Sequence, residues 1–508
     1  MELTTAVRGG QAPAARRRAA RLDGWTVSTI LVAVAVAGPL VVLPASFVAS
    51  PGALSDFVGL LPDALTATAW LVAGVGTGTL VLGTGLAALV VFCDFPGRRW
   101  IEWALVLTLA MPGYVFTLVL YPYVYLLARA AFLAQAGDLI EAARGLGLSR
   151  ARAVLRIAIP LARPAIVGGV ALALMEALAD FGTVNLLGIQ TFTNAIYKVW
   201  FGAFDRDAAL QLGTMLVTIT LALLMLERIS RGRARYGQGS SRGRAQAPVR
   251  LRGPAGFAAV AGPLLLVSLI VLAPVAQLGA WSLASIRDGL LAPEFAIAAR
   301  NSLMLAAMSI AIVVGVALVL AYGWRARRSR TTAAAVRVAT IGYGLPGSVV
   351  AVAVIVPLGW LDHRLDDVAG VGLLLTGTVI GLFAAYTVRF LALAFQSTDT
   401  GLERVPRSLD EAARGLGSDR LDVLARVHVP LIAPALLTAG LLVFTEVMKE
   451  LPATLLLRPL GGDTLAIAVW QATTESLYET AALPALLIVL VGLIPVAVLI
   501  RLSRRAAS

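Results

Sequence analysis

Five ionisable residues stand in two apolar stretches of the sequence, where charge is costly and usually functional, and the four acids among them occupy matching places. They are Glu176 and Asp180 in the first stretch, and Glu446, Lys449 and Glu450 in the second. The two acids of each stretch are four residues apart and share one helical face. We expect Glu176 and Glu446 to line a weakly polar passage for a cation. For Asp180 and Glu450 the sequence favours the outer membrane boundary instead, with Lys449 neutralising a neighbour.

Other kinds of chemistry lack the residues they need. The two histidines, His363 and His428, and the lone Cys93 cannot form a histidine-rich metal site or an intramolecular disulfide. A phosphate-binding P-loop requires a lysine that follows a glycine, but Lys198 follows a tyrosine and Lys449 a methionine. We therefore expect no catalytic residue, no metal site and no cofactor bound by this chain.

The composition indicates an all-α polytopic membrane protein. Of 508 residues, 59% are hydrophobic and 14% charged, mean hydropathy is +0.85, and several apolar runs exceed the roughly 18 residues that cross a bilayer. A net charge of +13 is also found in nucleic-acid-binding proteins. Here the arginines cluster between apolar runs, where positive charge fixes membrane orientation. The expected partner is the lipid bilayer, with no nucleic acid.

One heptapeptide occurs twice and reveals an internal duplication. EAARGLG spans residues 141–147 and again 411–417, 270 positions later. The same shift relates Pro160 to Pro430, Glu176 to Glu446 and Asp180 to Glu450.

Each copy predicts a helix-turn-helix on the cytoplasmic membrane face. The alanines favour a helix, a glycine is suited to end it in the left-handed conformation, and a serine can cap a second helix. We expect a proline to stop that second helix where the next span begins. In order, these residues are Glu141, Ala142, Ala143, Gly147, Ser149 and Pro160 in one copy, and Glu411, Ala412, Ala413, Gly417, Ser418 and Pro430 in the other.

The apolar runs give two parallel repeats of about six transmembrane helices, both termini being cytoplasmic. The domains are an N-terminal arm (1–24), a first transmembrane domain (25–227), an Arg/Gly/Ser-rich cytoplasmic linker (228–253) and a second transmembrane domain (254–508). First-half spans are expected at 25–48, 65–93, 101–127, 164–187 and 208–226. Second-half spans are expected at 255–281, 302–324, 339–361, 371–395, 432–455 and 481–500, with an outer loop at 362–367.

The first repeat is about one span short. Pro112 and Glu141 are 29 positions apart, whereas the matching Pro346 and Glu411 are 65 apart. Five spans would place the first EAARGLG outside, against the arginines around it. Either a re-entrant hairpin between residues 101 and 134, broken at Pro112–Gly113, restores the cytoplasmic position, or a deletion damages this half.

The repeated loop resembles the cytoplasmic loop of binding-protein-dependent ABC importer permeases, and two copies resemble their fused, prokaryotic inner-membrane forms. The resemblance implies coupling helices that dock two copies of an ATPase, which uses the ATP, and an extracytoplasmic substrate-binding protein. Residues 180–197 and 448–459 most resemble ferric iron permeases. Thiamine and aminoalkylphosphonate permeases remain alternatives, as does an ion-driven secondary transporter, a class that also uses internal repeats.

Overall fold

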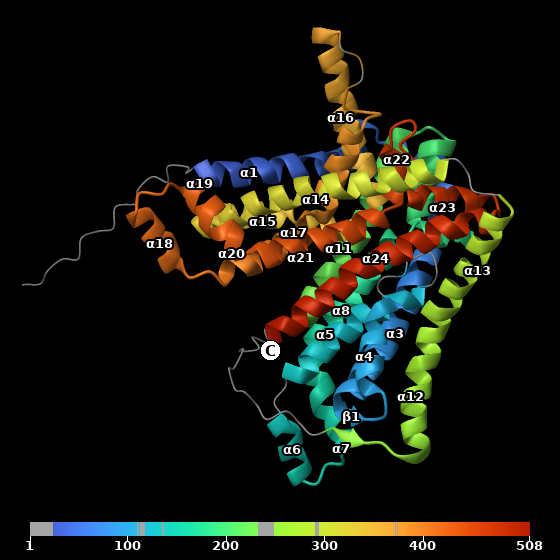
Figure 1. Ribbon diagram of the computed structural model, residues 1–508. Coiled ribbons are helices and arrows are strands. Elements are labelled where there is room, and N and C mark those ends of the chain that lie inside the picture. The colour runs from blue at the N-terminus through green and yellow to red at the C-terminus, as the bar shows by residue number, and fades with distance from the viewer. Residues whose placement is uncertain are drawn as a thin grey trace, which may run out of the picture.

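The computed structural model describes residues 24–108, 111, 117–134, 137–231, 248–289, 294–370, 372 and 374–507. The expected break at Pro112–Gly113, most of the N-terminal arm and most of the linker lie outside these residues. The described chain is built almost wholly of helices (Figure 1). This confirms the all-α class.

The first half begins with α1 (Gly24–Ala37), η1 (Gly38–Val41), α2 (Val42–Ala49), η2 (Ser55–Leu60), α3 (Leu61–Phe92) and β1 (Cys93–Asp94). It continues with α4 (Arg98–Leu107), η5 (Thr117–Leu120), α5 (Tyr121–Ala134), α6 (Gly137–Gly145), α7 (Arg150–Ala153) and η6 (Val154–Ala158). It ends with α8 (Ile159–Ala179), α9 (Gly182–Leu186), α10 (Phe192–Tyr197), η7 (Lys198–Gly202) and α11 (Arg206–Arg231).

The second half begins with β2 (Val249–Arg250), which pairs in parallel with β1, and with α12 (Gly253–Val267), η8 (Ser268–Leu272) and α13 (Ala273–Arg287). Next come α14 (Glu294–Ala326), α15 (Arg330–Ala339), η9 (Ile341–Gly344), α16 (Gly347–Ala369) and α17 (Val379–Glu403). The last elements are α18 (Arg407–Gly415), α19 (Arg420–Asp422), η10 (Val423–His428), α20 (Val429–Leu431), α21 (Ala433–Met448), α22 (Pro452–Leu457), α23 (Leu465–Thr474) and α24 (Tyr478–Ala507).

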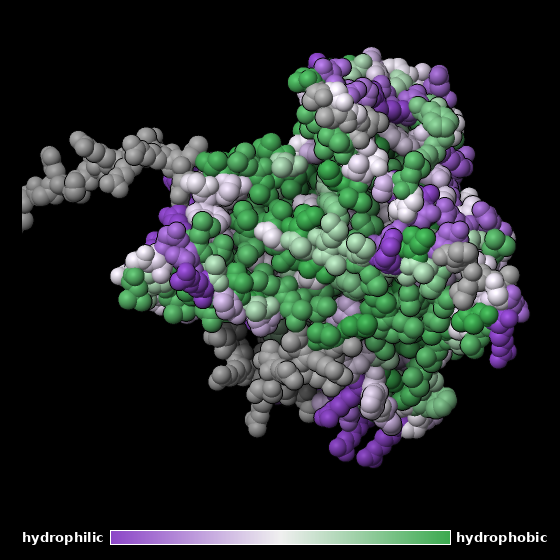
Figure 2. Space-filling model, turned by 45° about the horizontal axis from the view of Figure 1, so that its top comes forward, coloured by the Kyte–Doolittle hydropathy of each residue, from purple (hydrophilic) through white to green (hydrophobic). Residues whose placement is uncertain are grey.

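Among the described residues, nine helical runs are long and apolar enough to cross a membrane, and a bent pair makes a tenth. The polytopic class is thereby confirmed. In Figure 2 hydrophobic side chains fill the middle of the visible face and hydrophilic ones gather at its edges. Bilayer-spanning helices need this distribution, because lipid tails cannot solvate polar groups.

The expected single span at 101–127 is wrong, because α4 and α5 are two separate short helices. They form an antiparallel pair: the Tyr121 hydroxyl donates to the Leu105 carbonyl at 3.0 Å, and Arg129 pairs with Glu102. Ile101 and Leu105 bury one face of α4 while Trp100 remains exposed. Residues 98 and 134 therefore lie at the same end of the molecule, in agreement with the hairpin alternative.

Further boundaries differ from expectation. The span expected at 339–361 begins after Pro346 and continues as α16 to Ala369, so residues 362–367 are helical rather than a loop. The Asp362 carboxylate stabilises this end, because it accepts hydrogen bonds from the backbone amides of Leu374, Leu375 and Thr376 at 2.6–3.0 Å. The span expected at 371–395 is α17, eight residues later at each end. The span expected at 164–187 begins inside one helical run, Arg150–Ala179, which ends eight residues earlier than expected.

Helix packing follows the same order in the two halves. α3, α5 and α8 pack together in the first half, as α14, α17 and α21 do in the second. Small residues permit the close contacts: a Cβ atom built on Gly83 or Gly169 would lie 2.6 Å from atoms of Val124. The first helix of the chain packs on the other half, since α1 contacts α14 and α15.

Candidate functional site

The first repeated loop folds as a helix, a tight turn and a second helix. α6 ends at Gly145, and Gly147 takes the left-handed conformation with φ of 87°. The amide of Leu148 donates to the carbonyl of Ala143 at 3.1 Å and closes the turn. A side chain at Gly147 would strain this backbone, which explains why the position is glycine.

The second loop repeats this geometry. Gly417 also has φ of 87°, and the amide of Ser418 donates to the carbonyl of Ala413, again at 3.1 Å. The predicted glycine turn is therefore confirmed in both copies. In Figure 1, α6 and α18 lie at two separate projecting ends of the molecule.

The predicted serine caps are wrong in detail. Ser149 occupies the N-cap position of α7 but its hydroxyl makes no capping hydrogen bond. In the second copy the cap is Asp419 rather than Ser418, and its carboxylate accepts from the amide of Asp422 at 2.7 Å. Asp419 is 270 positions after Ser149, so the two caps do correspond within the duplication.

The prolines do not both stop a helix. Pro160 lies inside the continuous helical run Arg150–Ala179, directly after the π-helical turn Val154–Ala158. That wider turn accommodates a residue without an N–H group. After Pro430 the helix does break at Ile432, where the two parts differ by 77°. The prediction is wrong for Pro160 and holds within two residues for Pro430.

Both loops present the same exposed surface. Glu141 and Glu411 are exposed, as are Ala142 and Ala412, whereas the second alanine of each copy is buried or partly buried. Leu146 and Leu416, at the tips, are 87% and 88% exposed. The sequence interpretation overlooked these leucines, although their position inside the repeated heptapeptide was a signal. An apolar side chain placed in solvent at the same point of two loops fits a pocket on a partner protein.

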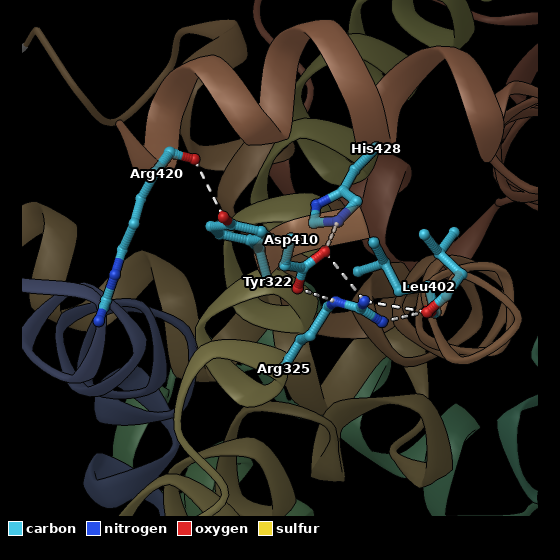
Figure 3. Close-up of polar contacts among 7 residues, drawn as sticks. Tyr322, Arg325, Leu402, Asp410, Arg420 and His428 are labelled. Atoms are coloured by element: carbon cyan, nitrogen blue, oxygen red, sulfur yellow. Dashed lines mark hydrogen bonds and ion pairs between the residues drawn. The ribbon is translucent and has the colours of Figure 1, made fainter. Parts of the chain in front are cut away.

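The second loop is additionally held by a polar network (Figure 3). The Arg325 guanidinium, at the end of α14, donates to both carboxylate oxygens of Asp410 at 3.2 Å, and His428 Nε2 lies 2.7 Å from Asp410 Oδ1. Arg325 also donates to the carbonyls of Leu402 and Val405 at 2.5 and 2.9 Å. Burial raises the pKa of Asp410, but the hydrogen bonds from Arg325 and His428 outweigh it and hold this pKa below its usual value.

The first loop has no residues of these types at the matching positions. Asp410 corresponds to Ile140 and His428 to Ala158. Instead, Ala143 and Ala153 are buried there in an apolar cluster with Phe92 and Phe132. The two loops thus share an outer surface but are held to the protein by different interactions.

The ionisable residues of the spans come from both halves. Lys449 Nζ lies 3.0 Å from Glu446 and 3.4 Å from Glu176. Their side chains are 15–28% exposed. The structure therefore brings Glu176, Glu446 and Lys449 together in one ion-pair cluster that connects α8 with α21.

Asp180 and Glu450 have a different local role. Each accepts a hydrogen bond from the backbone amide three residues later, Thr183 at 3.0 Å and Ala453 at 2.9 Å, and so begins a short helix. Glu450 is only 4% exposed and pairs at 2.5 Å with Arg389 of α17, itself 10% exposed. Sequence analysis missed Arg389, although an arginine inside an expected apolar span was a signal.

Comparison with known proteins places this geometry in a family. Residues 311–508 match the family model described as the binding-protein-dependent transport system inner membrane component. An Fe(3+)-transport system permease protein of Haemophilus influenzae is 27% identical over 86% of this chain and 89% of its own length. A Salmonella typhimurium relative whose name gives it as a 2-aminoethylphosphonate transport system permease protein is 28% identical over 26% of this chain and 49% of its own length.

A third relative settles the membership. It is named as a probable molybdenum ABC transporter permease protein of Haloferax volcanii, and it is 31% identical over 47% of this chain and 86% of its own length. Together with the family match over the second half and the membrane-spanning helices, this similarity shows that the chain belongs to the inner-membrane permease components of binding-protein-dependent ABC transporters.

Proposed function

We propose that this chain is the fused permease of an ATP-driven ferric iron importer, in which one polypeptide supplies both halves of the pore. The observation that carries this is the similarity to the Haemophilus influenzae Fe(3+) permease over 86% of the chain, because it includes both copies of the repeated loop. The loops end in equal glycine turns and expose equal surfaces, as a pair of equivalent docking elements requires.

The ATP-hydrolysing subunits dock on the two loops from the cytoplasm. Two copies of one ATPase present two equal grooves, which suit the exposed residues around Glu141 and Leu146 in one loop and Glu411 and Leu416 in the other. The absence of a P-loop lysine from the sequence supports hydrolysis by a separate subunit. An extracytoplasmic binding protein supplies the cargo, and the description of the matching family as binding-protein-dependent supports this.

The ion-pair cluster marks the translocation path. The charges are counted for this cluster together with the neighbouring pair of Glu450 and Arg389. With every group ionised, the three glutamates carry three negative charges and the two cations carry two positive charges, which leaves one net negative charge. Asp180, which matches Glu450 in the duplication, adds a second net negative charge. This balance favours a cation over an anion. Because Lys449 joins α8 to α21, movement of the halves during alternating access must exchange these ion pairs.

An uptake experiment tests cargo and energy source together. The chain is produced together with its ATPase and binding protein in cells that lack their own ferric iron importer, and uptake of radiolabelled ferric iron is measured against 2-aminoethylphosphonate and thiamine. We expect at least tenfold iron uptake over cells without the chain, lost when the ATPase is inactivated. Uptake of another cargo would reject ferric iron, and uptake without ATP hydrolysis would indicate a secondary transporter.

The Asp410 network predicts that the two loops differ in their sensitivity to protease. The same assay reports on which side of the membrane the loops lie. Replacing Asp410 with Asn removes the ionised partner of Arg325 and His428, so α18 should loosen while Arg325 keeps its bonds to Leu402 and Val405. In inverted vesicles without ATPase, we expect trypsin cleavage at Arg414 to become several-fold faster and cleavage at Arg144 to stay unchanged. Equal rates in D410N and wild type would contradict the role of the network. Cleavage in intact spheroplasts would contradict the cytoplasmic orientation.

A further inference from the structure

The starting observation is the environment of α16. Its first two turns are buried among helices of the other half: Val349 and Val352 share one apolar cluster with Leu43 of α2, Ile196 of α10 and Leu212 of α11. α16 also packs on α22. The elements α2, α10, α11 and α22 therefore contribute to the surface that α16 covers, together with η1 and α17.

The first half has no sequence for a counterpart of α16. The interval from Pro112 to Glu141 is 36 positions shorter than the interval from Pro346 to Glu411, and α16 itself has 23 residues. The elements that would surround such a helix are nevertheless present. In chain order α13 corresponds to α2, α23 to α10, α24 to α11 and α9 to α22, and α24 packs on α13 and α23 as α11 packs on α2 and α10.

These four elements line a cavity of about 620 Å³. Leu278 of α13 and Ala481, Ala485 and Val489 of α24 form apolar walls. At the other end, near the turn between α23 and α24, the rings of Trp281 and Tyr478 stack with centroids 6.2 Å apart. Thr473 and Ser476 add polar atoms beside them. The cavity is thus apolar along its length and amphipathic at one end.

The length of the cavity suits an acyl chain. Tyr478 and Val489 both line it and are about 16 Å apart along α24, at about 1.5 Å per residue. An extended acyl chain of this length fits along the apolar walls that α13 and α24 provide.

We propose that this cavity binds one acyl chain of a membrane phospholipid, which occupies the place that a first-half counterpart of α16 would take against α13, α23, α24 and α9. The chain lies along Leu278, Ala481, Ala485 and Val489. The headgroup lies beside Trp281 and Tyr478, because amphipathic aromatic rings belong at the level of the headgroups. A lipid tail can replace a helix at this place, because lipid tails are as apolar as the leucines they contact.

Photocrosslinking of the full-length chain in lipid nanodiscs tests the proposal. The probe is a phosphatidylcholine with a diazirine at the end of one acyl chain, and adducts are mapped by mass spectrometry. We expect adducts on α13 around Leu278. Ala485→Trp, which fills the cavity from α24, should reduce these adducts at least fivefold. Leu490→Trp makes a comparable change at a position on α24 that is 49% exposed, and should leave them unchanged.

Several results would overturn the proposal. Adducts on α13 that Ala485→Trp does not reduce, or that Leu490→Trp reduces equally, would mean ordinary contact with surrounding lipid. Labelling by a free diazirine fatty acid but not by the phospholipid would identify a different ligand, and a polypeptide crosslinked at Leu278 would identify a protein partner. If Ala485→Trp is not monodisperse, Gln277→Trp fills the same cavity from α13, and adducts are then read on α24 at Ala481.

Discussion

Replacing Leu146 and Leu416 together by aspartate should weaken binding of the ATPase by at least about a hundredfold and abolish transport. Burial of one exposed leucine side chain contributes about 1.5–3 kcal/mol, and these two leucines are 87% and 88% exposed. Their combined loss of about 3 kcal/mol or more corresponds to a factor above 100 in affinity. An aspartate in the same pocket adds the cost of burying a charge.

The measurement is co-purification of the ATPase with the permease at a series of concentrations. Because both side chains lie in solvent, the variant should keep the thermal unfolding midpoint of the wild type. Leu460→Asp is the matched control, since Leu460 is fully exposed at the turn after α22, away from both loops. Unchanged ATPase binding by the double variant, or an equal loss in Leu460→Asp, would show that the tips of the loops do not enter the partner.

The single variants address the difference between the loops. Since Asp410 ties α18 to Arg325, the second loop offers a more rigid surface than the first. Leu416→Asp alone should therefore cost more affinity than Leu146→Asp alone, because a rigid docking element loses less conformational entropy on binding.

The turn at each repeated loop could be predicted from sequence because local backbone physics determines it. Gly147 and Gly417 adopt the left-handed conformation that ends a helix, and no distant contact is needed to explain them. The apolar runs were predictable for a similar reason, since the bilayer imposes their length. Ten of the eleven expected spans correspond to helical runs in the structure, counting the bent pair as one.

Contacts between distant parts of the chain could not be predicted. The shift of 270 positions pairs Glu176 with Glu446, but only the fold shows that Lys449 joins them. The helical course of residues 362–367 depends on hydrogen bonds that Asp362 accepts from residues beyond the helix. The stop expected at Pro160 failed because a π-helical turn, which has no sequence signal of its own, accommodates the proline.

Arg389 has no charged counterpart in the first half, yet it supports Glu450, a residue that does have one. The shift of 270 positions relates Arg389 to Val119, so the first half offers no equivalent cation. It pairs with Glu450, which in turn begins α22 by accepting from Ala453. Arg389 therefore stabilises the short helix that follows the ion-pair cluster, and with it one wall of the translocation path that we propose.

Arg389→Met should destabilise the protein by about 3–5 kcal/mol, the usual cost of removing one partner from a buried ion pair. Glu450 is only 4% exposed, so water cannot solvate the carboxylate that remains. The expected result is a clear fall in the thermal unfolding midpoint of the purified protein, with transport lost in proportion to the folded fraction.

The double variant Arg389→Met with Glu450→Gln is the decisive control. Glutamine is neutral and keeps an oxygen that accepts from the Ala453 amide, so the helix cap survives and no charge is left buried. We expect this variant to recover most of the lost stability. Arg389→Lys should recover only part of it, because an ammonium group lacks the planar fork that fits a carboxylate.

If the double variant is no more stable than Arg389→Met, then the cost arises from lost packing around Phe390 rather than from the unpaired carboxylate. If it is fully stable but does not transport, Arg389 acts in translocation itself, beyond its support of α22.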